Sequence, residues 1–99
     1  MDKRDVMIIA KKYANEVEKL FHPSAIVLYG SHAKGTARDE SDIDIAVVFS
    51  AFKGDFLETS KKLWNLTWDI DDRIEPILLD CTNDNSGFVN EVFKTGQVL

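Results

Sequence analysis

Two aspartates near the middle of the chain stand at a spacing that could support phosphate chemistry. Asp42 and Asp44 open an apolar segment and are separated by one residue, so strand alternation would place both carboxylates on the same face of a sheet. Carboxylates held this close repel each other, and a hard divalent cation such as Mg²⁺, which prefers oxygen ligands, relieves the repulsion. The pattern therefore predicts a metal site at the start of this strand.

A glycine and a serine precede these aspartates at the end of another apolar segment. A strand that ends in Gly30-Ser31 and then enters a helical turn exposes unpaired backbone amides, and the missing glycine side chain lets a phosphate approach them. A Gly-Ser turn or an Asp-x-Asp pair is common by itself. Asp44, however, is followed by a β-branched apolar run in which a buried carboxylate is costly without a partner. Together the two features favour a phosphate-binding site.

Helices and strands must hold these residues in place, and hydrophobic periodicity predicts where they lie. Helices are expected at 5–21, about 55–69 and 88–95, strands at 25–29, 43–49 and 73–79, and a weakly helical segment at 31–37. Pro76 lacks an amide donor, so the third strand suits an edge position. Trp64 and Trp68, one turn apart, are expected to fill the core rather than to form a base-stacking platform. The fold class is α/β of the α+β type, with helices around a small sheet.

Length and charge restrict the class of protein further. The 99 residues predict a single domain, 1–99, with no separate substrate domain. A net charge of -5 argues against broad nucleic-acid binding. The single cysteine, Cys81, cannot form an internal disulfide, and the N-terminal segment lacks the apolar stretch of a secretory signal. With no apolar run long enough to cross a bilayer, we expect a cytoplasmic protein that does not insert into membranes.

The residues above resemble a family signature. Gly30-Ser31, ten intervening residues and Asp42-Ile43-Asp44 are similar to the Gly-Ser-x10-Asp-x-Asp pattern of the polymerase-beta-like nucleotidyltransferase superfamily. The short length, the helix before the first strand and the segment 94–99 resemble its minimal nucleotidyltransferase (MNT) branch, so the resemblance spans nearly the whole chain. It implies a mixed sheet, here of about three strands, a nucleoside triphosphate donor, release of pyrophosphate and two Mg²⁺ ions.

The same resemblance implies roles for the residues around the glycine turn. Gly30 and Ser31 would contact the outer phosphates of the donor, and Asp42 and Asp44 would hold the two ions. The fuller form of the signature also includes Ala33-Lys34-Gly35, Arg38 and Ser41.

Lys34, Arg38 and Ser41 complete the expected nucleotide-binding set. Lys34 and Arg38 are cations close to the phosphate turn, although Arg38 could equally pair with Asp39 or Glu40 at the surface. His32 is expected to pack in the loop or to face solvent rather than to act in catalysis.

The family also uses a third carboxylate on a neighbouring strand, as a metal ligand or as the acceptor of the substrate proton. Glu75 is our choice, with Asp72 and Asp80 as alternatives. Minimal members often carry Asp there, and the following Pro76 is unusual. Asp72 belongs to the acidic turn 69–72, which is expected to be a solvated helix end, and Asp80 lies past the expected strand.

A metal-dependent nucleotidyltransferase that moves AMP from ATP to a hydroxyl is therefore the leading hypothesis. Without a second domain, the chain would need an acceptor site on a partner protein or in a homo-oligomer. MNT proteins are commonly paired with HEPN-domain ribonucleases, and some act as antitoxins by adenylylating a partner tyrosine, so the resemblance implies such a partner. The alternative is an antitoxin with little or no catalysis that sequesters its toxin. Small-molecule modification, as in the larger aminoglycoside nucleotidyltransferases, is less favoured. No motif identifies the donor base.

Overall fold

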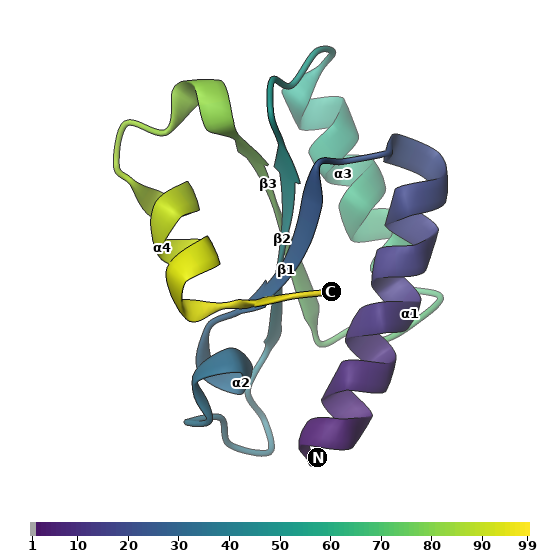
Figure 1. Cartoon of the computed structure of the whole chain (residues 1–99). Helices are drawn as coiled ribbons and strands as arrows, with labels where there is room; N and C mark the ends of the chain where they lie inside the picture. Colours follow the sequence, from purple (N-terminus) through teal and green to yellow (C-terminus); the bar gives the residue numbers. More distant parts are fainter. Residues whose placement is uncertain (1) are drawn as a thin grey trace.

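A four-stranded mixed sheet lies between two helical layers in the computed structural model, which describes residues 2–99 (Figure 1). The elements are α1 (Lys3–Phe21), β1 (Ala25–Tyr29), α2 (Ser31–Lys34), β2 (Ile43–Phe49), α3 (Phe56–Thr67), β3 (Ile74–Asp80), a 3-10 turn (Cys81–Asn83), α4 (Phe88–Thr95) and β4 (Gln97–Val98). The strand order is β3-β2-β1-β4. β2 runs parallel to β3 and antiparallel to β1, which is antiparallel to β4. The expected α+β class and mixed sheet are confirmed.

The fourth strand, β4, is an addition to the three that were expected. Its two residues pair with Val27 and Leu28 of β1, and two residues are too few to show strand alternation in a sequence. At the other edge of the sheet lies β3, where Pro76 stands opposite Ile45 of β2. The expected edge position of the proline-containing strand is confirmed.

Alternation along β2 gives the sheet two separate apolar faces. Ile43, Ile45 and Val47 belong to the larger core with α1 and α3. Ala46 and Val48 belong to a smaller core with α4. Asp44 is two residues from Ala46, so its side chain lies on the same face of the sheet as Ala46 and Val48, which is the face covered by α4 (the α4 face). That face carries the functional candidates discussed below.

The larger core is closed by α1, whose buried stripe follows the expected helical period. Asp2 caps the helix, its carboxylate accepting a hydrogen bond from the Asp5 amide at 2.9 Å. Inside the core, the hydroxyl of Tyr13 donates to the Leu63 carbonyl of α3 at 2.7 Å and so ties the two helices together. Among the helices of residues 2–99, none combines the length and the apolar character that a membrane span requires.

The tryptophans of α3 are not in the core, so the expectation that they fill it was wrong. Leu63 and Thr67 are the buried residues of this helix. Trp64 is 43% exposed, and Trp68, the C-cap residue, is 78% exposed. One residue step turns a helix by about 100°, so Trp64 and Trp68 each point well away from the buried residue that precedes them. Size and apolarity alone had favoured burial.

Candidate active site

Two carboxylates from two parallel strands share the α4 face of the sheet, and a third lies just before one of these strands. Asp44 of β2 and Glu75 of β3 are register partners, and parity places both side chains on the same face. Asp42 stands two residues before Asp44, at the entry to β2. Asp80 pairs with Phe49 at the opposite end of β3, roughly 16 Å from Glu75 at the usual rise per residue. The strand register therefore favours Glu75 over Asp80 as the third carboxylate.

The pKa values of Asp44 and Glu75 show the effect of neighbouring negative charges. Burial and then the neighbouring Asp42 raise the pKa of the Asp44 carboxyl, while His32 opposes this. The pKa of Glu75 is raised by partial desolvation of its largely exposed side chain, by the charges of Asp42 and Asp44, and by a hydrogen bond with Asp42. Asp42 and Asp44 are thus close enough to Glu75 to disfavour its ionisation, and Asp42 does the same to Asp44. A bound cation would remove that penalty.

The oxygen atoms of Asp42, Asp44 and Glu75 are suitable ligands for Mg²⁺, although their side chains are not arranged as a complete coordination site. All three groups are hard oxygen donors, and their mutual repulsion is the condition that a divalent ion relieves. Across residues 2–99, no three His, Cys, Asp or Glu side chains are already arranged as a group that could hold a metal ion. Ligation would therefore need side-chain rotation, and the assignment of Asp42, Asp44 and Glu75 as ligands stays a prediction.

Gly30 makes the closest backbone approach to these carboxylates. It lies between β1 and α2 with φ 75° and ψ -154°, a region of backbone space that is open essentially to glycine alone. A Cβ atom at this position would overlap Oδ2 of Asp44. The residue therefore has to be glycine for two independent reasons, its dihedral angles and the carboxylate beside it. The first amides of α2, beginning at Ser31, have no acceptor within the helix by geometry and are available to an anion.

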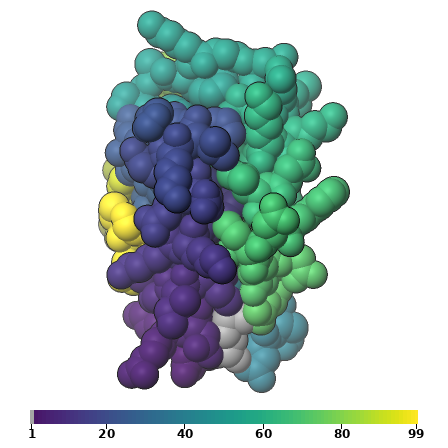
Figure 2. Space-filling view, turned by 90° about the vertical axis from the view of Figure 1, so that its right-hand side faces the viewer, coloured from purple at the N-terminus to yellow at the C-terminus, as the bar shows by residue number. Residues whose placement is uncertain are grey.

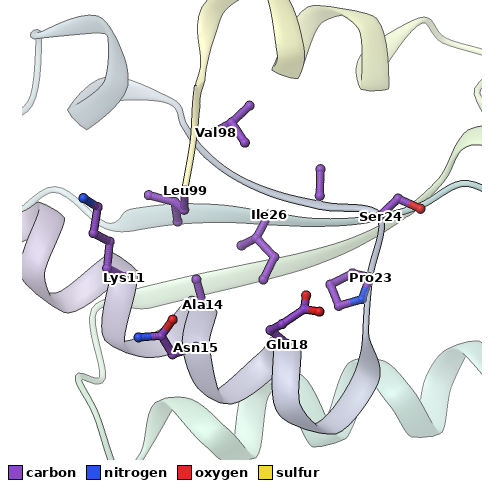
Figure 3. Close-up of a pocket in the computed structure, with 10 residues that line it drawn as sticks. Lys11, Ala14, Asn15, Glu18, Pro23, Ser24, Ile26, Val98 and Leu99 are labelled. Carbon is purple, nitrogen blue, oxygen red and sulfur yellow. The ribbon is translucent and has the colours of Figure 1, made fainter.

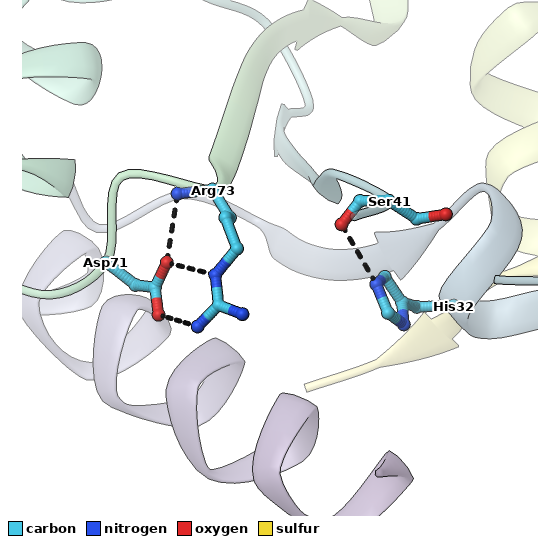
Figure 4. Close-up of polar contacts among 4 residues, drawn as sticks. All are labelled: His32, Ser41, Asp71 and Arg73. Carbon is cyan, nitrogen blue, oxygen red and sulfur yellow. Dashed lines mark hydrogen bonds and ion pairs between the residues drawn. The ribbon is translucent and has the colours of Figure 1, made fainter. Parts of the chain in front are cut away.

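The loop between α2 and β2 is held by contacts of His32 and Ser41. Nε2 of His32 lies 3.3 Å from the Ser41 carbonyl oxygen (Figure 4). The Ser41 hydroxyl accepts a hydrogen bond from the Arg38 amide at 2.8 Å. His32 was expected to pack in the loop or to face solvent, and the structure shows the first of these; that it takes no part in catalysis stays a prediction. Ser41 stabilises the turn that leads to Asp42, while nucleotide contacts of Ser41, Lys34 and Arg38 stay predictions.

Tyr29 also belongs to this region. From the sequence alone it had been expected only to be the last residue of a strand. It is the register partner of Asp44 across β1 and β2, and its ring packs edge-to-face against Phe88 of α4, with centroids 5.7 Å apart. Burial, Asp44 and Glu75 raise the pKa of its hydroxyl to about 12. Strand alternation could have identified Tyr29, because it is two residues from Val27 and therefore lies on the same face of the sheet as α4.

An ion pair fixes the chain where it enters β3. The Asp71 carboxylate accepts hydrogen bonds from the Arg73 amide and Nε, each at 2.9 Å, and from Nη2 at 2.6 Å (Figure 4). The Arg73 carbonyl accepts from the amide of Ile43, the residue between the two aspartates of the signature, at 2.8 Å. The acidic turn 69–72 had been expected to be a solvated helix end. It is instead held in place by this ion pair. Through Arg73 it aligns β2 with β3.

Asp71→Asn is expected to lower stability at neutral pH and to have little effect in acid. Arg73 holds the pKa of Asp71 below its ordinary value. Because the folded-state pKa lies below that of the unfolded chain, the stabilisation is complete above about pH 4, the ordinary range for Asp, and is lost as the pH falls through the folded-state value. Urea unfolding of both proteins at several pH values measures this. A difference that persists at the acidic end would contradict the assignment, and Asp72→Asn in the same turn is the matched control.

A cavity of about 370 Å³ lies elsewhere in the molecule (Figure 3). Its wall includes Ala14 and Glu18 of α1, Ile26 of β1 and the terminal Leu99. Ile26 belongs to the core beneath α1, so this cavity opens on the face of the sheet opposite the carboxylates. It is not the site of the predicted phosphate chemistry.

Comparison with known proteins decides the family. The profile of the family described as Polymerase beta, Nucleotidyltransferase matches residues 9–99. The chain belongs to this family. The nucleotidyltransferase resemblance drawn from the Gly-Ser and Asp-x-Asp residues is thereby confirmed, and the matched region contains all three candidate carboxylates. No curated protein gives a significant sequence match.

Solved structures resemble this nucleotidyltransferase along almost its whole length. A protein from Sulfolobus solfataricus described as a candidate nucleotidyltransferase is 26% identical with a TM-score of 0.72, the match covering 97% of this chain and 80% of that one. The toxin–antitoxin MntA–HpeT, in a mutant form, gives 18% identity and a TM-score of 0.57, covering 99% and 72%. A toxin–antitoxin with AMP-PNP gives 21% and 0.55 with the same coverage. The last two likenesses show a shared fold.

Proposed function

We propose that this nucleotidyltransferase moves AMP from ATP to a hydroxyl group on a partner protein and thereby acts as an antitoxin. The observation that carries the proposal is the approach of Asp42, Asp44 and Glu75 beside the Gly30 turn. The solved structures named as toxin–antitoxin, one of them with AMP-PNP, support a protein partner and an adenine nucleotide. A HEPN-domain toxin with an acceptor tyrosine is the partner that the family resemblance favours.

Each group of the site has a separate task in this reaction. The backbone amides after Gly30 and the Ser31 hydroxyl bind the outer phosphates of the donor. Asp42, Asp44 and Glu75 would hold Mg²⁺ ions, which when bound neutralise the charge on the reacting phosphates and on the leaving pyrophosphate. The acceptor oxygen forms a bond to the α-phosphorus as the bond from that phosphorus to the bridging oxygen breaks. As the alternative to metal ligation, Glu75, whose side chain is exposed to solvent, takes the acceptor proton.

The direct test is transfer of label from α-labelled ATP. The protein is incubated with Mg²⁺ and the product of the adjacent gene, and the partner is then examined for an AMP adduct. We expect label on a hydroxyl side chain of the partner and none when the metal is chelated. Tight binding without any transfer would instead favour the sequestering antitoxin. Labelling of a small molecule alone would point to the third class of function.

Glu75→Gln is expected to reduce transfer by roughly 10²- to 10⁴-fold, the usual range for loss of a general base. Asp80→Asn and Asp72→Asn are expected to retain activity, because Asp80 lies at the far end of β3 and Asp72 lies in the turn before it. Steady-state transfer rates of the three purified variants give the comparison. If Asp72→Asn or Asp80→Asn were the damaging change, the third carboxylate would have been assigned to the wrong residue.

A further inference from the structure

Four exposed side chains form a narrow line along α3 and its C-cap. We call Leu57, Lys61, Trp64 and Trp68 the α3 stripe. Successive members are four, three and four residues apart, so they fall within a sector of about 60° on the helix surface. Leu57 is 79% exposed, Trp64 43% and Trp68 78%. Three of the four large apolar side chains that are exposed on α3 and its C-cap therefore lie along one line.

Residues 2–99 leave the apolar members of this stripe at least 43% exposed. A different side of α3, about 100° around the helix, packs into the core through Leu63 and Thr67. Figure 2 shows α1 and α3 side by side as the outermost layer of this face, with no other element lying over them. Two indole side chains on one exposed line are unusual for the surface of a monomer. Trp and Tyr are, by contrast, enriched at the centres of protein interfaces.

The order of residues along the stripe is self-complementary. When two copies of α3 pack antiparallel about a two-fold axis located between Lys61 and Trp64, Leu57 faces the partner's Trp68. The same operation places Lys61 against the partner's Trp64, and symmetry generates each contact twice. An ammonium group against an indole face is an attractive cation–π contact. Each member of the stripe thus meets a side chain of suitable chemistry.

Charge also favours a second copy at this surface. The chain carries a net charge of -5, so most pairings of two copies bring carboxylates together. The α3 stripe contains a cation and no carboxylate. Beside it, Glu58 and Lys62 are 3.6 Å apart and largely neutralise each other. The α3 stripe is therefore a surface on which two copies can approach without bringing carboxylates together, and each Lys61 then lies against the partner's Trp64 rather than against an acidic group.

We infer that this protein forms a two-fold symmetric homodimer through antiparallel packing of the α3 stripe. Asp44 and Glu75 lie on the α4 face, on the other side of the sheet from α3. Dimerisation therefore leaves both candidate active sites open, and it does not depend on whether transfer occurs.

Trp64 and Trp68 provide a specific readout, because they are the two tryptophans of the chain. Sedimentation equilibrium is expected to show a monomer–dimer transition. Over the same concentration range, tryptophan emission is expected to shift to shorter wavelength as both indoles leave water. A protein that stays monomeric at the highest soluble concentration, with emission typical of exposed indole, would overturn the inference.

Variants of the stripe test the proposed geometry. Trp68→Ala and Lys61→Glu are each expected to weaken dimerisation by on the order of 100-fold, because two-fold symmetry removes every contact twice. Lys61→Arg keeps the cation and is expected to dimerise. Lys53→Glu makes the same charge change outside the stripe, and Val98→Ser removes an exposed apolar group at the β4 edge. Both are expected to dimerise like the unmodified chain.

Circular dichroism of the variants shows whether they stay folded, which we expect because the altered side chains are exposed. A dimer that persists in both Trp68→Ala and Lys61→Glu would place the interface elsewhere and overturn the inference. Loss of binding to the toxin in these variants, with no self-association of the unmodified chain, would reassign the stripe to that partner.

Discussion

Asp44→Asn is expected to abolish measurable transfer while making the metal-free protein more stable. Loss of a carboxylate that organises charge on the reacting phosphates typically removes several kcal/mol of transition-state stabilisation, or roughly 10³-fold or more in rate. The pKa of Asp44 is raised in the fold, so its ionised form destabilises the protein above that pKa and does not do so in acid. Transfer assays and thermal unfolding, both with and without Mg²⁺, measure the two effects.

The pairing of lower activity with higher stability separates a functional carboxylate from a structural one. Asp42→Asn is expected to lose activity in the same way. Asp71→Asn, which removes a carboxylate paired with Arg73, is expected to lose stability instead. Mg²⁺ should raise the unfolding temperature of the unmodified protein and should have a smaller effect on Asp44→Asn. Retained transfer in Asp44→Asn would remove this residue from the catalytic set.

Gly30→Ala is the second change with a large expected effect, and it should reduce both activity and stability. The positive φ at this position costs a residue with a side chain about 1–3 kcal/mol, and the added Cβ overlaps the Asp44 carboxylate. Displacing that carboxylate would misalign a ligand of the proposed metal site. Urea unfolding and transfer rates of the variant check both consequences.

Gly87→Ala is the matched control for this experiment. Gly87 shares a positive φ, 74° against 75° for Gly30, but its ψ of 15° lies in the left-handed helical region, where strain is milder, and a Cβ placed there meets no atom within 4 Å. We expect a moderate loss of stability from backbone strain alone, with transfer retained. If Gly30→Ala and Gly87→Ala had the same activity, the contact between Gly30 and Asp44 would have no catalytic consequence.

The strands that carry the carboxylates were predictable because their physical signals are local. β1 and β2 begin and end where the apolar runs do, at Ala25–Tyr29 and Ile43–Phe49. The face on which Asp44 lies follows from strand alternation alone. Tyr29 shares that face, but its approach to Asp44 depends on the register between two strands. Register is a tertiary property, and the sequence of either strand does not contain it.

The tryptophans and the third carboxylate show where sequence patterns stop being sufficient. Trp64 and Trp68 are apolar and lie at helical spacing, yet only the packing of Leu63 and Thr67 determines which side of α3 is buried. Glu75 was the preferred third carboxylate in the sequence, with Asp72 and Asp80 as alternatives. The parallel pairing of β2 with β3 distinguishes them by distance from Asp44. In both cases the missing information was a contact between distant segments.

The central position of β2 determines when the proposed site can assemble during translation. Gly30, Asp44 and Glu75 come from three different strand regions, and β2 is the strand that joins them. A growing chain that has reached Asp44 already contains both aspartates, but it lacks the parallel neighbour that supplies the third carboxylate. The proposed three-carboxylate site can therefore form only after β3 has been made and has paired with β2.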